Sequence, residues 1–210
     1  DAVRDVGGDY HKRVDLAWLD GILAVAKADA GGIVRAREQL AADTGLVAAR
    51  LERSLAAFES EMRGDRDSAA RLMLELVREV RDIGSWGSSH PMELPVHRLA
   101  AGRWLLATGD AAIADSLLRW HEGLYAFSGE EGWALNATMP IVILERARLN
   151  AGLGRTDAAR RFYEEFLRRF DMPDESLRHL VVEAGRALAR LVPVFMPELL
   201  FRLVPDGQPL

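Results

Sequence analysis

The sequence LNAGLGRTDAARRFYEEFL, residues 149–167, contains the pattern from which the architecture of the chain can be inferred. An apolar-periodic segment ends at Gly154, and a small residue, Ala159, follows five positions later. Glycine accepts the positive φ with which many helices end, and a small side chain allows two helices to cross closely. Phe162 and Phe166 then lie on one face of a second helix. The segment therefore predicts two helices joined by a tight turn.

The same combination of glycine and alanine recurs along the chain. The four pairs are Gly31 with Ala36, Gly64 with Ala69, Gly109 with Ala114, and Gly154 with Ala159. The glycines are 33, 45 and 45 residues apart. Repetition at such a period indicates an array of similar units, each of which buries its apolar face on a neighbour. Because no segment alternates in polarity like a strand, we predict an all-α fold, an α-solenoid of antiparallel helix pairs.

The two 45-residue copies also place a proline at equivalent points, Pro95 and Pro140. Proline is tolerated in the first turn of a helix, where its missing N–H removes no hydrogen bond. Each proline is therefore expected to begin the first helix of its pair. The segments before them, 83–94 and 123–139, are then expected to be inserted loops.

A turn glycine, a small residue five positions later and an aromatic residue or leucine four further on resembles the tetratricopeptide repeat. The resemblance covers roughly residues 14–191, and the 33-residue spacing is close to the 34-residue period of that family. The chain departs from the family pattern in its first helices. Arg98 and Ile143 stand where the family has a large aromatic residue, and only Gly102 matches the family's glycine.

The resemblance implies a tetratricopeptide-like superhelix over residues 1–191 as a single domain, closed by a capping helix at about residues 175–191. An apolar tail, residues 192–210, follows it. Similar arrays are found at the carboxyl end of larger bacterial regulatory proteins. Because the chain begins at Asp1 in the middle of a helical pattern, we expect it to be part of such a protein.

Composition argues against several classes of function. The net charge of -5 comes from well-mixed acids and bases, so the basic stripe expected of a nucleic-acid-binding protein is missing. No apolar run approaches the roughly 20 residues that span a bilayer. The chain has no cysteine, which fits a reducing compartment. We therefore expect a cytoplasmic protein with no nucleic-acid or membrane partner.

The sequence also offers little for catalysis or metal binding. His121 and Glu122 begin like a zinc-protease helix, but the second histidine of that motif would fall at Tyr125. The five histidines are scattered, without a pair four residues apart. No glycine-rich loop has the spacing of a nucleotide phosphate site. The prediction is a protein that is not an enzyme and that holds no metal and no cofactor.

A binding face follows from the resemblance, which implies that the residue six before each turn glycine faces the concave groove. That residue is Arg103 or Arg148 in the two long copies, and Val25 or Phe58 in the earlier ones. Guanidinium groups suit carboxylates, so the partner is expected to be a protein or peptide, and one with acidic side chains or a free carboxyl end would fit. The alternative is that each arginine pairs with a nearby acid of the array, for example Glu145.

Aromatic residues supply a second set of candidates. Trp86 and Trp133 fall in the two expected loops, where they would anchor a partner or act as lids over the core. Trp18, Trp104 and Trp120 lie on expected helices and are predicted to pack in the core or between repeats. The tail would fold back over the last helix or mediate homo-oligomer formation.

The leading hypothesis is a non-catalytic protein–protein interaction scaffold that binds a peptide or partner domain through its concave face. The alternative is a helical small-ligand sensor or enzyme with a pocket under the Trp86 and Trp133 loops, where His90, His97 or His121 would act. A structural spacer is the third possibility. Fold-level resemblance does not choose between them, because function depends on sites.

Overall fold

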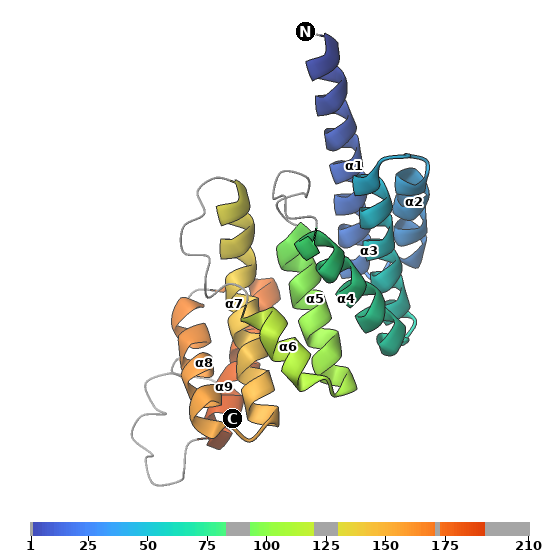
Figure 1. Cartoon of the computed structure of the whole chain (residues 1–210). Helices are drawn as coiled ribbons and strands as arrows, with labels where there is room; N and C mark the ends of the chain where they lie inside the picture. Colours follow the sequence, from blue (N-terminus) through green and yellow to red (C-terminus); the bar gives the residue numbers. More distant parts are fainter. Residues whose placement is uncertain (1, 83–92, 120–129, 171–172, 192–210) are drawn as a thin grey trace. The chain divides into compact units, whose positions relative to one another are not determined.

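The computed structural model describes residues 2–82, 93–119, 130–170 and 173–191, and within these ranges every regular element is a helix (Figure 1). The elements are α1 (Ala2–Ala26), α2 (Ala30–Ala41), α3 (Leu46–Met62), α4 (Arg66–Asp82), α5 (Glu93–Thr108), α6 (Ala111–Leu118), α7 (Glu130–Gly152), α8 (Thr156–Arg169), the 3₁₀ helix η3 (Glu175–Leu177) and α9 (Arg178–Leu191). Packing is mostly between helices adjacent in the chain. The predicted all-α class is confirmed. No helix in the described ranges is long and apolar enough to cross a membrane.

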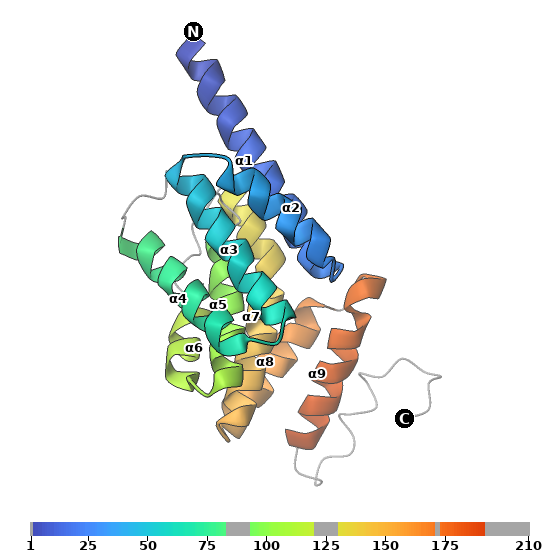
Figure 2. The same cartoon turned by 90° about the vertical axis from the view of Figure 1, so that its right-hand side faces the viewer.

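The chain divides into two compact units, residues 1–135 and residues 136–210, which are described separately as the N-terminal unit and the C-terminal unit. In the N-terminal unit, helices α1 to α6 lie side by side in chain order, and α1 also contacts α3 (Figures 1 and 2). The C-terminal unit contains most of α7, then α8, η3 and α9, with α8 packed against α9.

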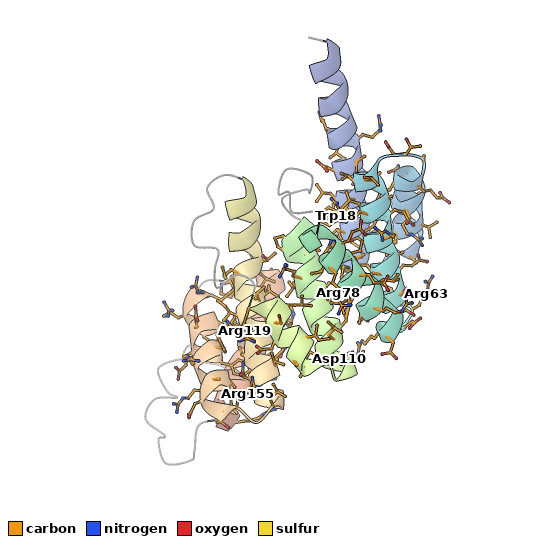
Figure 3. The ribbon with its side chains drawn as sticks, in the orientation of Figure 1. Trp18, Arg63, Arg78, Asp110, Arg119 and Arg155 are labelled. Atoms are coloured by element: carbon orange, nitrogen blue, oxygen red, sulfur yellow. The ribbon has the colours of Figure 1, made fainter. Side chains whose placement is uncertain are left out.

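Three of the predicted turns have the expected geometry. Gly64, Gly109 and Gly154 have φ of 82°, 99° and 68°. The N–H of the residue after each glycine donates to the carbonyl oxygen five residues earlier, at 2.9, 2.8 and 2.9 Å in turn. This hydrogen bond closes the helix end in the Schellman arrangement. Figure 3 labels a residue beside each of these turns, Arg63, Asp110 and Arg155.

The first turn lies three residues earlier than predicted. Its residue with positive φ is Ala28, at 54°, and the N–H of Asp29 donates to the carbonyl of Ala24 at 2.9 Å. Gly31 lies inside α2, so the predicted turn at Gly31 was wrong. The turn was predicted at a glycine because glycine accepts positive φ, but alanine can adopt this conformation at a cost of roughly 1–2 kcal/mol. Asp29 also favours the beginning of α2 at Ala30, because its carboxylate accepts a hydrogen bond from the N–H of Gly32 at 2.9 Å and so caps the helix.

With Ala28 as the reference, all four turns share the same buried positions. Five residues after the residue with positive φ come Ile33, Ala69, Ala114 and Ala159, each fully buried. Seven residues before it come Gly21, Ala57, Gly102 and Ala147. A Cβ on Gly21 would lie 2.4 Å from Leu55, and a Cβ on Gly102 would lie 2.8 Å from Leu118. These small residues therefore allow the close approach of neighbouring helices.

The start of α7 also differs from the prediction. The helix begins at Glu130, so residues 130–139, predicted as loop, are helical, and Pro140 lies inside the helix instead of beginning it. An interior proline costs about 3 kcal/mol because it removes one hydrogen bond and crowds the preceding turn. Continuous packing of α7 offsets this cost, since Ile143 and Leu144 are buried. Pro95, by contrast, lies in the first turn of α5, as predicted.

The C-terminal unit has an apolar core of its own. In the C-terminal unit, Tyr163 and Phe166 of α8 pack with Ala184 and Leu188 of α9 and with residues of α7. The predicted helix over residues 175–191 is present as η3 followed directly by α9. The predicted apolar tail, residues 192–210, lies outside the described residues.

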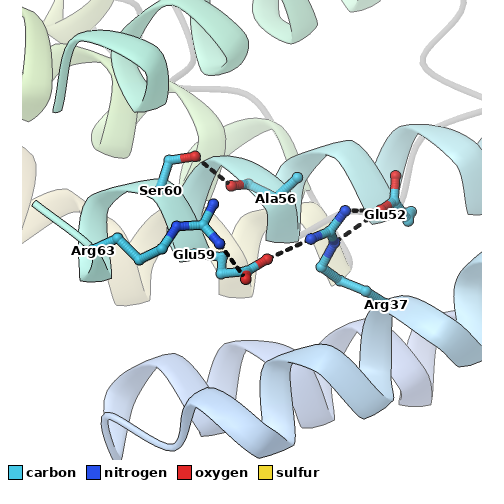
Figure 4. Close-up of polar contacts among 6 residues, drawn as sticks. All are labelled: Arg37, Glu52, Ala56, Glu59, Ser60 and Arg63. Atoms are coloured by element: carbon cyan, nitrogen blue, oxygen red, sulfur yellow. Dashed lines mark hydrogen bonds and ion pairs between the residues drawn. The ribbon is translucent and has the colours of Figure 1, made fainter. Parts of the chain in front are cut away.

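A charged network joins α2 to α3 on the surface of the N-terminal unit (Figure 4). Arg37 donates to Glu52 at 2.6 and 2.8 Å and also to Glu59, which accepts a further hydrogen bond from Arg63 at 2.6 Å. Partial burial tends to lower the pKa of Arg37, but the hydrogen bonds to Glu52 and Glu59 raise it overall. The network therefore adds polar contacts between α2 and α3 to the apolar contacts of their buried faces.

Candidate functional site

A buried polar cluster lies where the first helices α1, α3 and α5 of the N-terminal unit meet. It consists of Trp18, Ser54 and His97, and none of the three side chains is exposed. The indole Nε1–H of Trp18 donates to Ser54 Oγ at 3.3 Å, and His97 Nε2 lies 2.7 Å from the same oxygen. The two rings meet edge to face, with centroids 6.1 Å apart and planes at 90°.

Burial determines the protonation state of the histidine. Loss of solvent, with a smaller contribution from the positive charge of Arg50, lowers the pKa of His97 from 6.5 to about 3. Arg50 is itself buried, on α3. The imidazole is therefore neutral near pH 7. Trp18 donates to Ser54, whereas the direction of the hydrogen bond between Ser54 Oγ and His97 Nε2 depends on the tautomer of the imidazole, since either atom can carry the shared proton.

A serine hydroxyl bonded to a neutral imidazole is also the arrangement that activates a nucleophile. A substrate must reach the hydroxyl for that chemistry, and Ser54 and His97 are both fully buried. The cluster therefore stabilises the junction of α1, α3 and α5. His90 and His121, the other histidines considered for catalysis, lie outside the described residues. The predicted core position of Trp18 is confirmed, whereas its contact with Ser54 was missed.

Arg148 lies in an ion-pair cluster of the C-terminal unit. Its guanidinium donates to both carboxylate oxygens of Glu183 on α9, at 2.9 and 2.7 Å, and to Glu145 one turn earlier on α7, at 2.5 Å. The Glu145 side chain is only 5% exposed. Burial opposes the charge of Arg148, but Glu145 and Glu183 together raise its pKa. The pairing with Glu145, considered from the sequence as the alternative to partner binding, is present.

The other predicted groove residues have different surroundings. Arg103 is exposed on α5 of the N-terminal unit. Phe58 is half-buried on α3 and packs edge to face against Trp104, with ring centroids 5.2 Å apart. Val25 is half-buried and packs against the apolar core formed by α1, α2 and α3. Because the first turn is at Ala28, the residue six before it is Ile22, which replaces Val25 in the predicted series.

The predicted tryptophan anchors are described only in part. Trp86 lies outside the described residues. Trp133 belongs to α7 and not to a loop, and its side chain is also outside them. The role of the two tryptophans as a lid or an anchor therefore stays a prediction.

A shallow cleft of about 740 Å³ lies between α1 and the end of α2. Lys12, Asp20 and Gln39 are among its polar residues, and Leu16 is among its apolar ones. The hydrogen bond from Arg13 at 2.9 Å keeps the pKa of Asp43, at the edge of the cleft, below its ordinary value. Leu16 is half exposed, so the cleft is open to solvent.

Within the described ranges, no three side chains of the kinds that bind metals lie together in a group that could hold an ion. Comparisons with protein-family models, curated proteins and solved structures found no match for the chain.

Proposed function

We propose that the chain is a tetratricopeptide-like array that binds a protein or peptide and carries out no reaction. The observation that carries this proposal is the recurrence of one helix–turn–helix geometry at Ala28, Gly64, Gly109 and Gly154. The family pattern requires a small residue in each helix of a pair. With the corrected register, Gly21 joins Gly102 at the first-helix position, whereas Ile33 replaces Ala36 at the second-helix position of the first pair.

The first helices of the N-terminal unit are suited to form one continuous surface. Helices α1 and α3 are in contact, and the Trp18–Ser54–His97 cluster links both to α5. Six residues before each turn, this surface carries Ile22 and Phe58, which are half-buried, and then Arg103, which is exposed.

We expect an extended segment of a partner to lie along this surface. Its apolar side chains would contact Ile22 and Phe58, and a carboxylate would bind Arg103, because a guanidinium offers two parallel donors to such a group. Helical arrays of this kind use extended surfaces of adjacent units in binding.

The test is selection of ligands from a displayed peptide library by the whole immobilised chain, followed by hydrogen exchange of the complex. We expect the selected peptides to carry an acidic residue and to protect α1, α3 and α5. Arg103→Glu should weaken binding by about tenfold, which corresponds to roughly 1.4 kcal/mol.

Arg78→Glu is the matched control, because Arg78 is exposed on α4, a second helix of its pair, and carries the same charge (Figure 3). The affinity of this control should stay within about twofold of the wild-type value, well under the tenfold loss expected for Arg103→Glu. The absence of enriched peptides, or protection confined to α2, α4 and α6, would refute the proposal.

A further inference from the structure

The last helix, α9, has an unusual outer face. Arg178, His179, Arg186 and Arg190 are all exposed on it, and Val182 among them is 50% exposed. The opposite face packs into the core of the C-terminal unit. Steps of four residues place Arg178, Val182 and Arg186 along one line of the helix surface.

The positive charge of this face is not neutralised by the part of the chain that the structure describes. No salt bridge there involves Arg178, Arg186 or Arg190. The one acid on α9, Glu183, is held by both donors of Arg148.

The arginines of the N-terminal unit provide a contrast, because most of them are paired with a carboxylate. Those with a salt bridge are Arg13, Arg35, Arg37, Arg53, Arg63, Arg66, Arg71 and Arg119. Within the described residues, the guanidinium groups of Arg178, Arg186 and Arg190, which have no salt bridge, therefore differ from most arginines of the N-terminal unit.

We propose that the outer face of α9 binds an acidic amphipathic helix of a partner protein. Carboxylates of that helix would bind Arg178, Arg186 and Arg190, and one of its apolar side chains would cover Val182. At about 1.5 Å per residue, the distance along the helix from Arg178 to Arg190 is roughly 18 Å, or about three turns of a partner helix. An apolar centre with a charged rim is the usual composition of a protein interface.

The same features favour a protein partner over a nucleic acid. A phosphate backbone is tracked by continuous positive charge, whereas Val182 interrupts this row between Arg178 and Arg186. The net charge of -5 also opposes long-range attraction of a polyanion. The inference rests on the proposed function only in taking the partner to be a protein, and it concerns a different surface.

The experiment uses the whole chain and a displayed library of helical peptides of about 16 residues, long enough to cover the roughly 18 Å row. Glutamate is fixed on one face of each peptide and the neighbouring positions are randomised. A library with lysine in place of glutamate and a single-stranded DNA of similar length serve as comparison probes. We expect enrichment from the glutamate library alone, with an apolar residue selected beside the glutamates.

Arg186→Glu should weaken binding of the selected peptides by about tenfold or more, because an attraction between opposite charges becomes a repulsion between like charges. Arg168→Glu is the matched control, because Arg168 is exposed on α8 of the same unit and the charge change is identical. Three outcomes would overturn the inference: no enrichment, equal loss in both variants, or tighter binding of DNA than of the peptides. If this inference fails but peptides still bind the surface of α1, α3 and α5, the proposed function stands.

Discussion

Two polar clusters tie helices together in the two units, and they use different chemistry. In the N-terminal unit, neutral Trp18, Ser54 and His97 join α1, α3 and α5. In the C-terminal unit, Arg148 joins α7 to α9 through Glu145 and Glu183, so the linking groups are charged.

The difference shows how each junction can fail. A neutral cluster that excludes water is weakened when a proton is forced onto its histidine. A charged cluster is weakened when one partner is removed and a buried charge is left behind. The following experiments separate these two modes, in order of decreasing expected effect.

The largest effect is expected for Arg148→Ala. Because the Glu145 side chain is almost fully buried, the loss of its partner should lower the free energy of unfolding by about 3 kcal/mol. Urea denaturation followed by circular dichroism measures the change. Arg103→Ala, at the equivalent position of the N-terminal unit, should cost less than about 0.5 kcal/mol, as expected for a surface substitution. Equal effects would remove the distinction between the two arginines.

Mild acid should affect the N-terminal junction. His97 takes up its proton near pH 6.5 in the unfolded chain but only near pH 3 in the folded one. The unfolded state therefore binds more protons between these values, and this contribution is complete above pH 6.5 and is lost as the pH falls. The loss is about 1.4 kcal/mol per pH unit, or roughly 2 kcal/mol at pH 5.

Unfolding measured at several pH values for the wild type and for His97→Gln tests this. The glutamine variant should show a shallower slope between pH 6.5 and pH 4, whatever its stability at pH 7. Parallel slopes would mean that His97 does not control the acid response.

Ser54→Ala should cost about 1–2 kcal/mol, because it removes the oxygen shared by the two neutral partners of the cluster. The double variant Ser54→Ala, His97→Gln provides the coupling energy through a double-mutant cycle. A coupling near zero would show that the two side chains stabilise the junction independently.

Among the substitutions that break a polar cluster or network, the smallest effect is expected for Arg37→Met, at about 1 kcal/mol or less. Arg37 also bonds to two carboxylates, but these are more exposed than Glu145, at 21% for Glu52 and 15% for Glu59. Thermal unfolding of both variants, Arg37→Met and Arg148→Ala, compares their losses of stability. A loss as large as that of Arg148→Ala would show that burial of the acid is not the deciding factor.

The sequence predicted those parts of the fold that depend on neighbouring residues. Three turns followed from the positive φ that glycine accepts, and the alanines five residues later are buried because helices cross there. The first turn was misplaced because Ala28 adopts this conformation without a glycine. The start of α7 was misplaced because packing outweighs the effect of Pro140.

The polar clusters could be predicted only in part, because their members are distant in the chain. Glu145 lies one turn from Arg148 and was anticipated, whereas Glu183 is 35 positions away and was not. Ser54 and His97 are separated by 43 positions, and neither residue type marks a buried site. Such pairs depend on the tertiary arrangement, which a single sequence does not reveal.

The ring contact of Trp18 with His97 has a consequence for the order of folding. Most helices here pack against their immediate neighbours in the chain, and contacts of that kind form quickly because little loop entropy is lost. The tryptophan on α1 and the histidine on α5 are 79 positions apart, so that α2, α3 and α4 lie between them in the chain. Their indole–imidazole contact should thus be among the last to form, which makes the environment of Trp18 a reporter of the completed N-terminal unit.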